Sequence, residues 1–243
     1  MSKRNRNNNM KNNDFSPIVE KLKERGIPQE RITMEMSNGE RQRIVNQIPL
    51  RTFPMMIGIP MDEVMYSKFF MMFMRNLHIM PWDALTTTES TYLPEARNRV
   101  HNSFLAEEAY SHLFMVDSDV ICPPSTIERL LNHNLPIVAG WYHDKHPTQP
   151  NQPVVYDFLS ENDNGFAYWN KRKEAGKGLE KVDGVGAGCI LMDRKTAMTL
   201  GKDPYDMQKG GEDLVLCRKL MKLNIPLHVD WSIDCSHLGV MWK

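Results

Sequence analysis

The chain has 243 residues, 41% of them hydrophobic and 25% charged, a balance typical of a globular protein long enough for one large α/β domain. Thirty Lys and Arg balance thirty Asp and Glu, so no net positive field is available to attract nucleic acid or an acidic membrane. The longest uninterrupted apolar run, residues 69–74, is far shorter than the roughly 20 residues that a membrane-spanning helix needs.

The N-terminal part of the chain differs in composition from the rest. Residues 1–14 consist mainly of Asn, Lys and Arg and cannot form a hydrophobic core, so we expect them to be disordered. They contain neither the apolar stretch nor the cleavage pattern of a secretory signal. We therefore divide the chain into a polar N-terminal extension, residues 1–50, and a main domain, residues 51–243.

The cysteines indicate a reducing compartment, and we expect a cytoplasmic protein. They are widely scattered, which is typical of small buried hydrophobic residues rather than of a disulfide framework. The spacings among Cys217, His228, Cys235 and His237 fit none of the paired-ligand patterns of structural zinc sites. The four cysteines are Cys122, Cys189, Cys217 and Cys235.

From residue 53 onward, short apolar runs alternate with segments of helical periodicity. This alternation is typical of a mainly parallel sheet with crossover helices, so we predict an α/β fold. The spacing of Ser125 and Glu128 is that of a capping box at a helix start. We predict strands at 53–59, 79–85, 112–116, 135–141, 154–158, 166–169 and 227–231, with a turn and a strand within 181–192. We predict helices at 64–77, 94–109, 125–131 and 212–223.

Two carboxylates, Asp117 and Asp119, directly follow the apolar strand predicted at 112–116. In an open α/β sheet, ligands bind beyond the carboxyl ends of the strands, which is where this pair falls. Carboxylates so close together repel each other unless a cation lies between them, and their hard oxygens suit Mg²⁺ or Mn²⁺. An Asp at a strand end is also common in turns, where it accepts hydrogen bonds from backbone amides, so the spacing alone leaves both interpretations open.

Four segments, in this order along the chain, resemble the glycosyltransferases of the GT-A fold, especially the family-2-like group. They are TYLPEARNRV at 91–100, FMVDSDVICPPSTIERLL at 114–131, VDGVGAGCILMDR at 182–194 and GEDLVLCRKLMKLNIPLHVDWSIDCSHLG at 211–239. The resemblance covers residues 53–243 and implies a GT-A-like, Rossmann-like nucleotide-binding domain, with a mainly parallel sheet flanked by helices.

The resemblance implies a metal site. Asp117 and Asp119 would hold a manganese or magnesium ion on the diphosphate of a nucleotide sugar, with Asp119 as the more direct ligand and Asp117 on the ribose or the metal. In the resembling enzymes a His at the position of His237 completes the site, and an imidazole ligand favours manganese. A lone His is otherwise more often a core or surface residue.

Glu212 and Asp213 precede an amphipathic helix pattern. Position alone favours a structural role, because acidic residues at a helix start offset its dipole and cap free amides. In the resembling inverting enzymes, the Asp of such a pair deprotonates the acceptor hydroxyl. The resemblance therefore implies Asp213 as general base and Glu212 as a partner that binds the acceptor or orients the base.

The remaining candidates are donor-binding residues, again by the resemblance. Arg97 would lie near the nucleotide diphosphate or base, although an Arg just inside a helix is more often a solvated charge. Asp83, at the end of the second predicted strand, is a candidate nucleoside contact, and Ser118 lies between the two aspartates. Gly186 and Gly188 precede a strand rather than a helix, which argues against a dinucleotide fingerprint. They form a tight turn, let the backbone approach the donor sugar, or both.

The sequence thus predicts a metal-dependent glycosyltransferase that moves a sugar from a nucleotide sugar, in particular a UDP-sugar, to an acceptor hydroxyl with inversion. The acceptor is open among a glycan, a protein, a lipid and a modified nucleic-acid base, and the neutral charge argues only weakly against nucleic acid. Two alternatives remain. A sugar-phosphate nucleotidyltransferase would release pyrophosphate instead of a nucleoside diphosphate, and a catalytically idle module of the same fold would only bind sugars or a partner.

Overall fold

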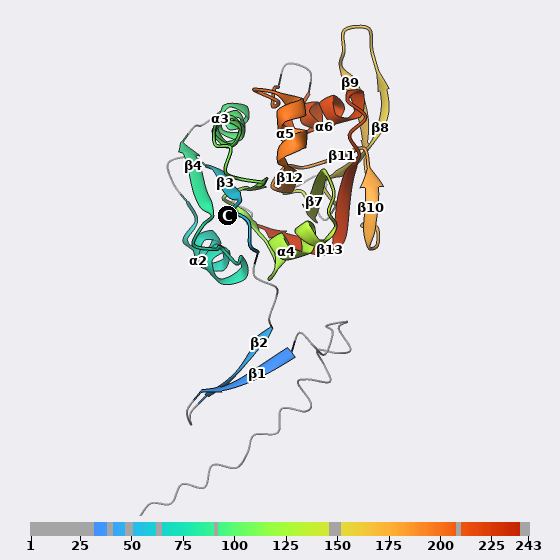
Figure 1. Ribbon diagram of the computed structural model, residues 1–243. Coiled ribbons are helices and arrows are strands. Elements are labelled where there is room, and N and C mark those ends of the chain that lie inside the picture. Colours follow the sequence, from blue (N-terminus) through green and yellow to red (C-terminus); the bar gives the residue numbers. More distant parts are fainter. Residues whose placement is uncertain are drawn as a thin grey trace, which may run out of the picture. The chain divides into compact units, whose positions relative to one another are not determined.

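The computed structural model describes residues 32–37, 41–46, 51–61, 65–89, 92–145, 152–207 and 210–238. The chain divides into two compact units, residues 1–50 and 51–243, which are described separately. In the first unit, β1 (Ile32–Ser37) and β2 (Arg41–Asn46) form an antiparallel hairpin that we did not predict (Figure 1). The residues expected to be disordered, 1–14, lie outside the described residues.

The second unit is built on a central mixed sheet. From one edge to the other its strands are β10 (Leu179–Val182), β13 (Leu227–His237), β7 (Ile137–Tyr142), β12 (Cys189–Asp193), β5 (His112–Val116), β3 (Met56–Met61) and β4 (Ala84–Glu89). Five of these seven described strands run in one direction, and only β10 and β12 run against them. The short β6 (Val120–Ile121) pairs with the end of β13. The predicted mainly parallel sheet is confirmed.

A second, smaller sheet is antiparallel. It consists of β11 (Gly184–Val185), β8 (Val155–Glu161) and β9 (Ala167–Lys171) in that spatial order. Because β11 is followed by a short turn and then by β12, this sheet is joined directly to the centre of the main one (Figure 1).

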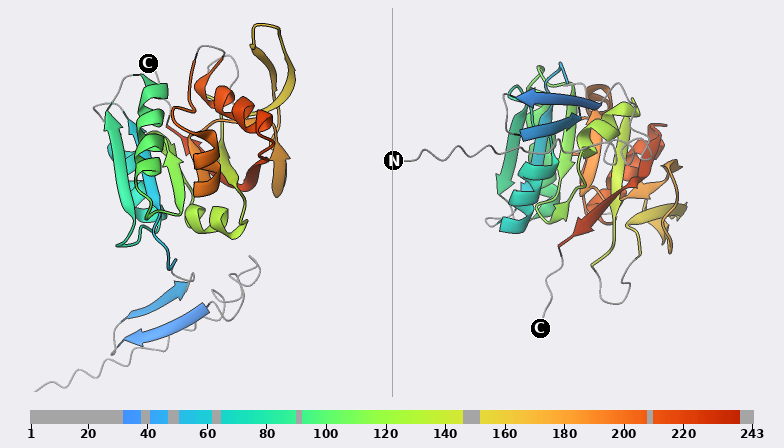
Figure 2. Two further views of the ribbon diagram at one scale, coloured as in Figure 1. Left: turned by 45° about the horizontal axis from the view of Figure 1, so that its top comes forward. Right: turned by 90° about the horizontal axis from the view of Figure 1, so that it is seen from below.

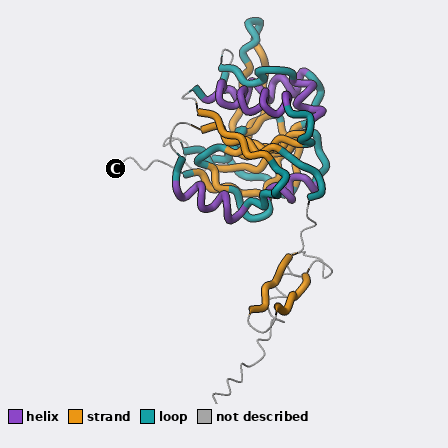
Figure 3. Tube along the Cα trace, turned by 60° about the vertical axis from the view of Figure 1, so that its left-hand side comes forward, coloured by secondary structure: helices purple, strands orange, loops and turns teal. Residues whose placement is uncertain are grey.

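Helices cover both faces of the central sheet, so the unit has three layers (Figure 3). One layer contains α3 (Leu93–Ala106), α5 (Arg194–Leu200) and α6 (Glu212–Lys222), and the other contains α2 (Ser67–Asn76) and α4 (Thr126–Asn132), as two further views show (Figure 2). Alternate residues of β5 contribute to the two hydrophobic clusters beneath these layers. Leu113 and Met115 belong to the cluster with α3, α5 and α6, whereas Phe114 and Val116 belong to the cluster with α2 and α4.

Most predicted elements of the second unit are present with shifted bounds, but the strand predicted at 79–85 is wrong. The backbone N–H of Asp83 donates to the carbonyl of Met80 over 3.0 Å in a turn, and β4 begins only at Ala84. Because β4 is an edge strand, it is rich in threonine instead of apolar residues. The apolar residues before β4 therefore led us to predict the strand too early in the sequence. The seven-residue helix α5 was not predicted.

The predicted capping box is also wrong, although the helix that follows it is confirmed. Ser125 has a left-handed backbone with φ of 60° and its side chain caps no amide. Glu128 instead contacts Nδ1 of His78 over 3.2 Å. Among the helices of the described residues, none has the length and the apolar character needed to cross a membrane.

Candidate active site

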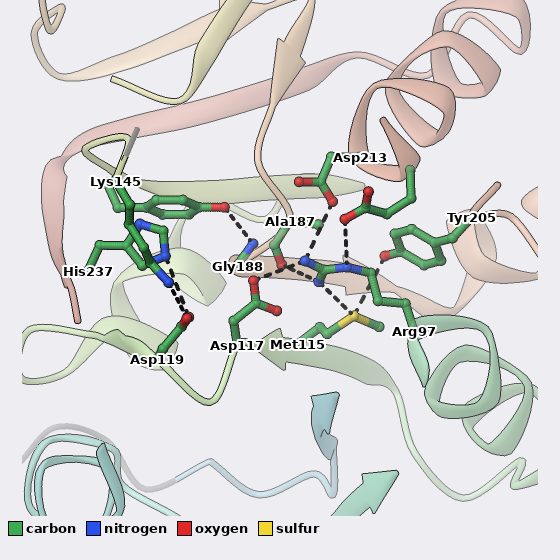
Figure 4. Close-up of polar contacts among 12 residues, drawn as sticks. Arg97, Met115, Asp117, Asp119, Lys145, Ala187, Gly188, Tyr205, Asp213 and His237 are labelled. Atoms are coloured by element: carbon green, nitrogen blue, oxygen red, sulfur yellow. Dashed lines mark hydrogen bonds and ion pairs between the residues drawn. The ribbon is translucent and has the colours of Figure 1, made fainter. Parts of the chain in front are cut away.

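The turn after β5 lies at the sheet edge where the parallel strands end. It carries Asp117, Ser118 and Asp119, and Figure 4 shows the two aspartates. The N–H of Val120 donates to the Asp117 carbonyl over 3.0 Å. The N–H of Asp117 donates to the carbonyl of Gly188 over 3.1 Å, which ties the D-x-D turn to the start of β12. The aspartates therefore occupy the position expected of a ligand site in an open α/β sheet.

Arg97, on α3, is only 1% exposed and lies among three carboxylates. Its Nη2 is 2.9 Å from Oδ2 of Asp117 and 3.6 Å from Oδ1 of Asp213. Its Nε is 3.6 Å from Oε1 of Glu212, and Nη1 donates to the carbonyl of Ala187 over 3.2 Å. Sequence reasoning gave Arg97 a direct role in donor binding. The enclosed guanidinium lies between the carboxylates of two separate motifs, the D-x-D turn and the Glu212–Asp213 pair.

Two of the three carboxylates around Arg97 have raised pKa values. Burial raises the pKa of Asp213 to about 6, with Arg97 opposing and Glu212 adding to the shift. Burial also raises the pKa of Asp117, against the effect of Arg97. The Oδ1 atoms of Asp117 and Asp213 are buried and have no hydrogen-bond partner among the described residues. A carboxylate with a pKa near 6 and an oxygen not used in a hydrogen bond can accept a proton near neutral pH.

Asp119 points away from Arg97, toward the end of β13. The Nδ1 of His237 lies 3.0 Å from the carbonyl oxygen of His143, which can only accept, so Nδ1 is the donor in this hydrogen bond. Nε2 of His237 then faces Oδ1 of Asp119 over 3.5 Å, while the ammonium of Lys145 contacts Oδ2. Burial alone would raise the pKa of Asp119, but the contacts with His237 and Lys145 outweigh it and lower the pKa.

This arrangement fits a divalent metal ion. Because Nδ1 of His237 donates to the His143 carbonyl, Nε2 is the ring nitrogen that could bind a cation, and it faces the Asp119 carboxylate. A backbone carbonyl that fixes the tautomer of the imidazole is typical of metal-binding histidines. The unpartnered Oδ1 of Asp117, on the same turn, supplies a further hard oxygen nearby.

The two glycines of the predicted turn make room for protein groups. A Cβ at Gly186 would lie 2.2 Å from the hydroxyl of Tyr142, and one at Gly188 would lie 2.9 Å from both that hydroxyl and Oδ2 of Asp117. The N–H of Gly188 donates to the Tyr142 hydroxyl over 3.1 Å. The protein groups that approach these glycines most closely are therefore Tyr142 at both and Asp117 at Gly188.

A segment without regular secondary structure covers Arg97. The guanidinium carbon lies 5.8 Å from the ring centroid of Tyr205, whose hydroxyl is 3.7 Å from Sδ of Met115. The side-chain amide of Asn98 donates to the Tyr205 carbonyl over 2.8 Å and accepts from the Tyr205 N–H over 2.9 Å. Sequence reasoning missed Tyr205, and with it Lys145 and the role of Tyr142, because no motif marks them.

Asp83 is not part of this site. Its carboxylate is fully buried, with Oδ1 2.7 Å and Oδ2 2.5 Å from the guanidinium of Arg51. It also accepts backbone N–H groups from Met55 and Met80 over 3.1 and 2.8 Å. Because Asp83 precedes β4, it lies at the amino end of that strand, whereas the D-x-D turn follows the carboxyl end of a parallel one. The structure therefore does not bring Asp83 together with the D-x-D turn.

Comparisons with known proteins support the fold. No protein-family model matches the sequence, and no curated protein matches it. Among solved structures, A197 from STIV is similar with a TM-score of 0.57 and 16% identity, over 77% of this chain and 86% of that one. The GT-A glycosyltransferase GalNAc-T7, solved with UDP, GalNAc and Mn²⁺, is similar with a TM-score of 0.54 and 9% identity, over 79% of this chain and 45% of that one. At these identities the likeness shows the fold alone, and the predicted GT-A-like α/β fold is confirmed.

Proposed function

We propose that this chain is a cytoplasmic, metal-dependent glycosyltransferase with residues 51–243 as its catalytic domain. It moves a sugar from a UDP-sugar to an acceptor hydroxyl, with inversion at the anomeric carbon. The observation that carries the proposal is the gathering of Asp117, Asp119, Asp213 and His237 at one edge of a GT-A-like sheet. The presence of UDP, GalNAc and Mn²⁺ in GalNAc-T7 supports the choice of donor and metal.

Asp119 and His237 would hold Mn²⁺ or Mg²⁺, with Asp117 beside them. The imidazole favours Mn²⁺, because Mg²⁺ prefers oxygen ligands. A metal bound there supplies positive charge that neutralises the diphosphate as it leaves. Ser118 shares the D-x-D turn and is a proposed hydrogen-bond partner of the donor. Gly186 and Gly188 support that turn through Tyr142.

Asp213 is the proposed base. The acceptor oxygen forms a bond to the anomeric carbon while the bond from that carbon to the diphosphate oxygen breaks. The hydroxyl proton passes to Asp213, and the nucleoside diphosphate leaves with the bonding electron pair. Arg97 orients Asp213 and Asp117 relative to each other, and Glu212 raises the proton affinity of the base.

The first test is nucleoside diphosphate release from a panel of UDP-, GDP- and other nucleotide sugars, with Mn²⁺ and with EDTA. We expect metal-dependent release from one donor, with water as acceptor. Asp119→Asn should abolish this release. The control variant, Asp163→Asn, alters an exposed carboxylate in the turn between β8 and β9 and should leave the release unchanged. Proton NMR of the sugar first released gives its anomeric configuration and tests inversion.

Other outcomes separate the alternatives. Release of pyrophosphate would indicate a nucleotidyltransferase. If no donor of the panel releases a nucleoside diphosphate and no nucleotide binds in a metal-dependent way, the transferase proposal is contradicted and a binding module is favoured. Release that Asp119→Asn leaves unchanged would show that the reaction does not use the proposed metal site.

A further inference from the structure

Three of the four cysteines converge beneath the candidate active site. Cys122 follows β6, Cys189 begins β12 and Cys235 lies near the end of β13, yet their sulfur atoms all lie within 4.8 Å of one another. Sγ of Cys122 is 3.6 Å from Sγ of Cys189. The three residues are 4%, 0% and 2% exposed.

The fourth cysteine, Cys217, provides a comparison within the same chain. It belongs to the hydrophobic cluster on the other face of the sheet, and its Sγ lies 3.6 Å from the carbonyl of Val185. Cys217 therefore has the place that sequence reasoning expected for all four, a small buried hydrophobic residue. The other three form a group of sulfur ligands that the linear sequence does not reveal.

The spacing of the three sulfurs suits a single metal ion. Sulfurs bound at about 2.3 Å to one ion lie about 3.8–4.0 Å from one another, so only small movements are needed. A Cβ at Gly140 would lie 3.0 Å from Sγ of Cys189 and 2.6 Å from a methyl group of Ile233, so a glycine is needed beside the cluster. The backbone of Gly140 also hydrogen-bonds the Cys189 sulfur, and an N–H donor stabilises a thiolate.

The surroundings indicate which metal. The cluster belongs to an apolar core that includes Val116 and Ile233, and no fourth His, Cys, Asp or Glu joins the sulfurs among the described residues. Structural zinc sites are closed by four protein ligands, so three sulfurs in a dry core suit Zn²⁺ poorly. Thiolates favour soft ions, and Cu(I) accepts trigonal coordination.

We propose that Cys122, Cys189 and Cys235 form a binding site for a soft monovalent metal ion of the Cu(I) class, separate from the D-x-D site. Each thiol that binds the ion as a thiolate releases its proton to solvent. The three cysteines lie on the chain segments that also carry Asp119, Gly188 and His237. A bound ion would therefore cross-link these three segments. This proposal does not depend on the proposed transferase activity.

The test uses the full chain, reduced and free of oxygen, titrated with Cu(I) in competition with a chromogenic Cu(I) chelator. We expect one tightly held Cu(I) per chain, with sulfur neighbours only in the copper X-ray absorption spectrum. Cys189→Ser should weaken Cu(I) binding by more than about 100-fold. Loss of a residue that only hydrogen-bonds a metal ligand lowers metal affinity by about 10–100-fold, and loss of the ligand itself should lower it further. The matched control, Cys217→Ser, should bind like the wild type.

Three results would overturn the proposal. They are no Cu(I) retained by the reduced wild-type chain, nitrogen or oxygen neighbours in its spectrum, and equal loss of binding in Cys217→Ser and Cys189→Ser. If Cys189→Ser does not fold, the copper X-ray absorption spectrum of the wild-type chain still tests the proposal, because it shows whether sulfur atoms bind the ion. A disulfide between Cys122 and Cys189 in air, combined with no Cu(I) binding in the reduced chain, would identify a redox pair instead.

Discussion

Nε2 of His237 faces Oδ1 of Asp119 over 3.5 Å, and the ammonium of Lys145 contacts the other oxygen of the same carboxylate. The Asp119 carboxylate therefore has one oxygen toward the imidazole of His237 and the other toward the ammonium of Lys145. Lys145 occupies a position from which it competes with any divalent ion for Asp119.

Removing this competitor should strengthen metal binding. Lys145→Ala should bind Mn²⁺ about fivefold more tightly, because a partly exposed ion pair contributes up to about 1 kcal/mol. Isothermal titration of Mn²⁺ into the wild type and the variant measures the difference. Lys195→Ala, an exposed lysine on α5, is the control and should leave the Kd unchanged. Weaker Mn²⁺ binding in Lys145→Ala would mean that Lys145 supports the site.

Arg97 should stabilise the fold by compensating buried charge. Arg97→Met leaves Asp117, Glu212 and Asp213 without their shared partner, and we expect a loss of about 3–5 kcal/mol in the free energy of unfolding at pH 8. Urea denaturation measures it. The loss should be smaller at pH 5, because Asp213, whose pKa burial raises to about 6, takes up a proton there.

The control for this prediction is on the same helix. Arg99 is 55% exposed and pairs with Glu95 one turn earlier, so Arg99→Met should change the free energy of unfolding by less than about 1 kcal/mol. Equal losses for Arg97→Met at pH 5 and pH 8 would show that uncompensated carboxylates are not the cause.

Catalysis should depend on ionised Asp213. Because burial raises its pKa to about 6, the rate of donor hydrolysis should rise with pH through about 6 and level off above it. Asp213→Asn should lower kcat by about 10²–10⁴-fold, the range for loss of a general base, while donor binding persists. Glu212→Gln should retain more activity and shift the pH profile to lower values, because a charge that raises the pKa of the base is removed. An unchanged kcat in Asp213→Asn would contradict the role of Asp213 as general base and would leave it only a structural role at the start of α6.

The same residue should reduce stability at neutral pH. The pKa of Asp213 in the folded chain, about 6, lies above its usual value of 3.8, so the folded chain binds the proton more tightly than the unfolded chain does. The stabilising contribution of the protonated Asp213 side chain is fully present below about pH 4 and is lost as pH rises through about 6. Relative to the wild type, Asp213→Asn should therefore gain up to about 3 kcal/mol between pH 4 and pH 8. Thermal or urea unfolding across this range tests it, and a constant difference would contradict the raised pKa.

Gly186 should be intolerant of a side chain because of Tyr142. Gly186→Ala places a Cβ 2.2 Å from the Tyr142 hydroxyl and should cost about 1–3 kcal/mol of stability. Tyr142→Phe in the same chain should recover part of this, with a coupling energy of about 0.5–3 kcal/mol in a double-mutant cycle. Gly211→Ser, where a Cβ would meet nothing within 4 Å and Ser is a good helix cap, should change stability by less than about 0.5 kcal/mol.

Local sequence patterns predicted the elements whose burial is continuous or periodic. Residues 112–116 form a strand buried on both faces, so the four residues after His112 are all apolar and the predicted bounds are those of β5. β13 was predicted only to residue 231, because beyond it Ile233 and Cys235 are buried while Ser232 and Asp234 are exposed, a one-sided alternation that is a weaker signal. β4 failed for the same reason at the sheet edge.

The candidate site was predictable only as far as motifs reach. The D-x-D pair, Glu212, Asp213 and His237 were selected by residue type and order, and the fold brings them to one region. The pairing of Arg97 with Asp117 and Asp213 depends on how α3, β5 and α6 meet, and no local pattern encodes it. The convergence of three cysteines is likewise a product of strand order, since β12 and β13 are separated in the sheet by β7.

The double hydrogen bond between Asn98 and Tyr205 has a consequence for local opening of the chain. The Asn98 side chain engages the main chain of Tyr205 as a neighbouring strand would, although residues 201–207 form no helix or strand. The Tyr205 amide proton should therefore exchange with deuterium far more slowly than those of its sequence neighbours, at a rate set by separation of this segment from α3. In Asn98→Ala that protection disappears, and solvent gains access to the guanidinium that Tyr205 covers.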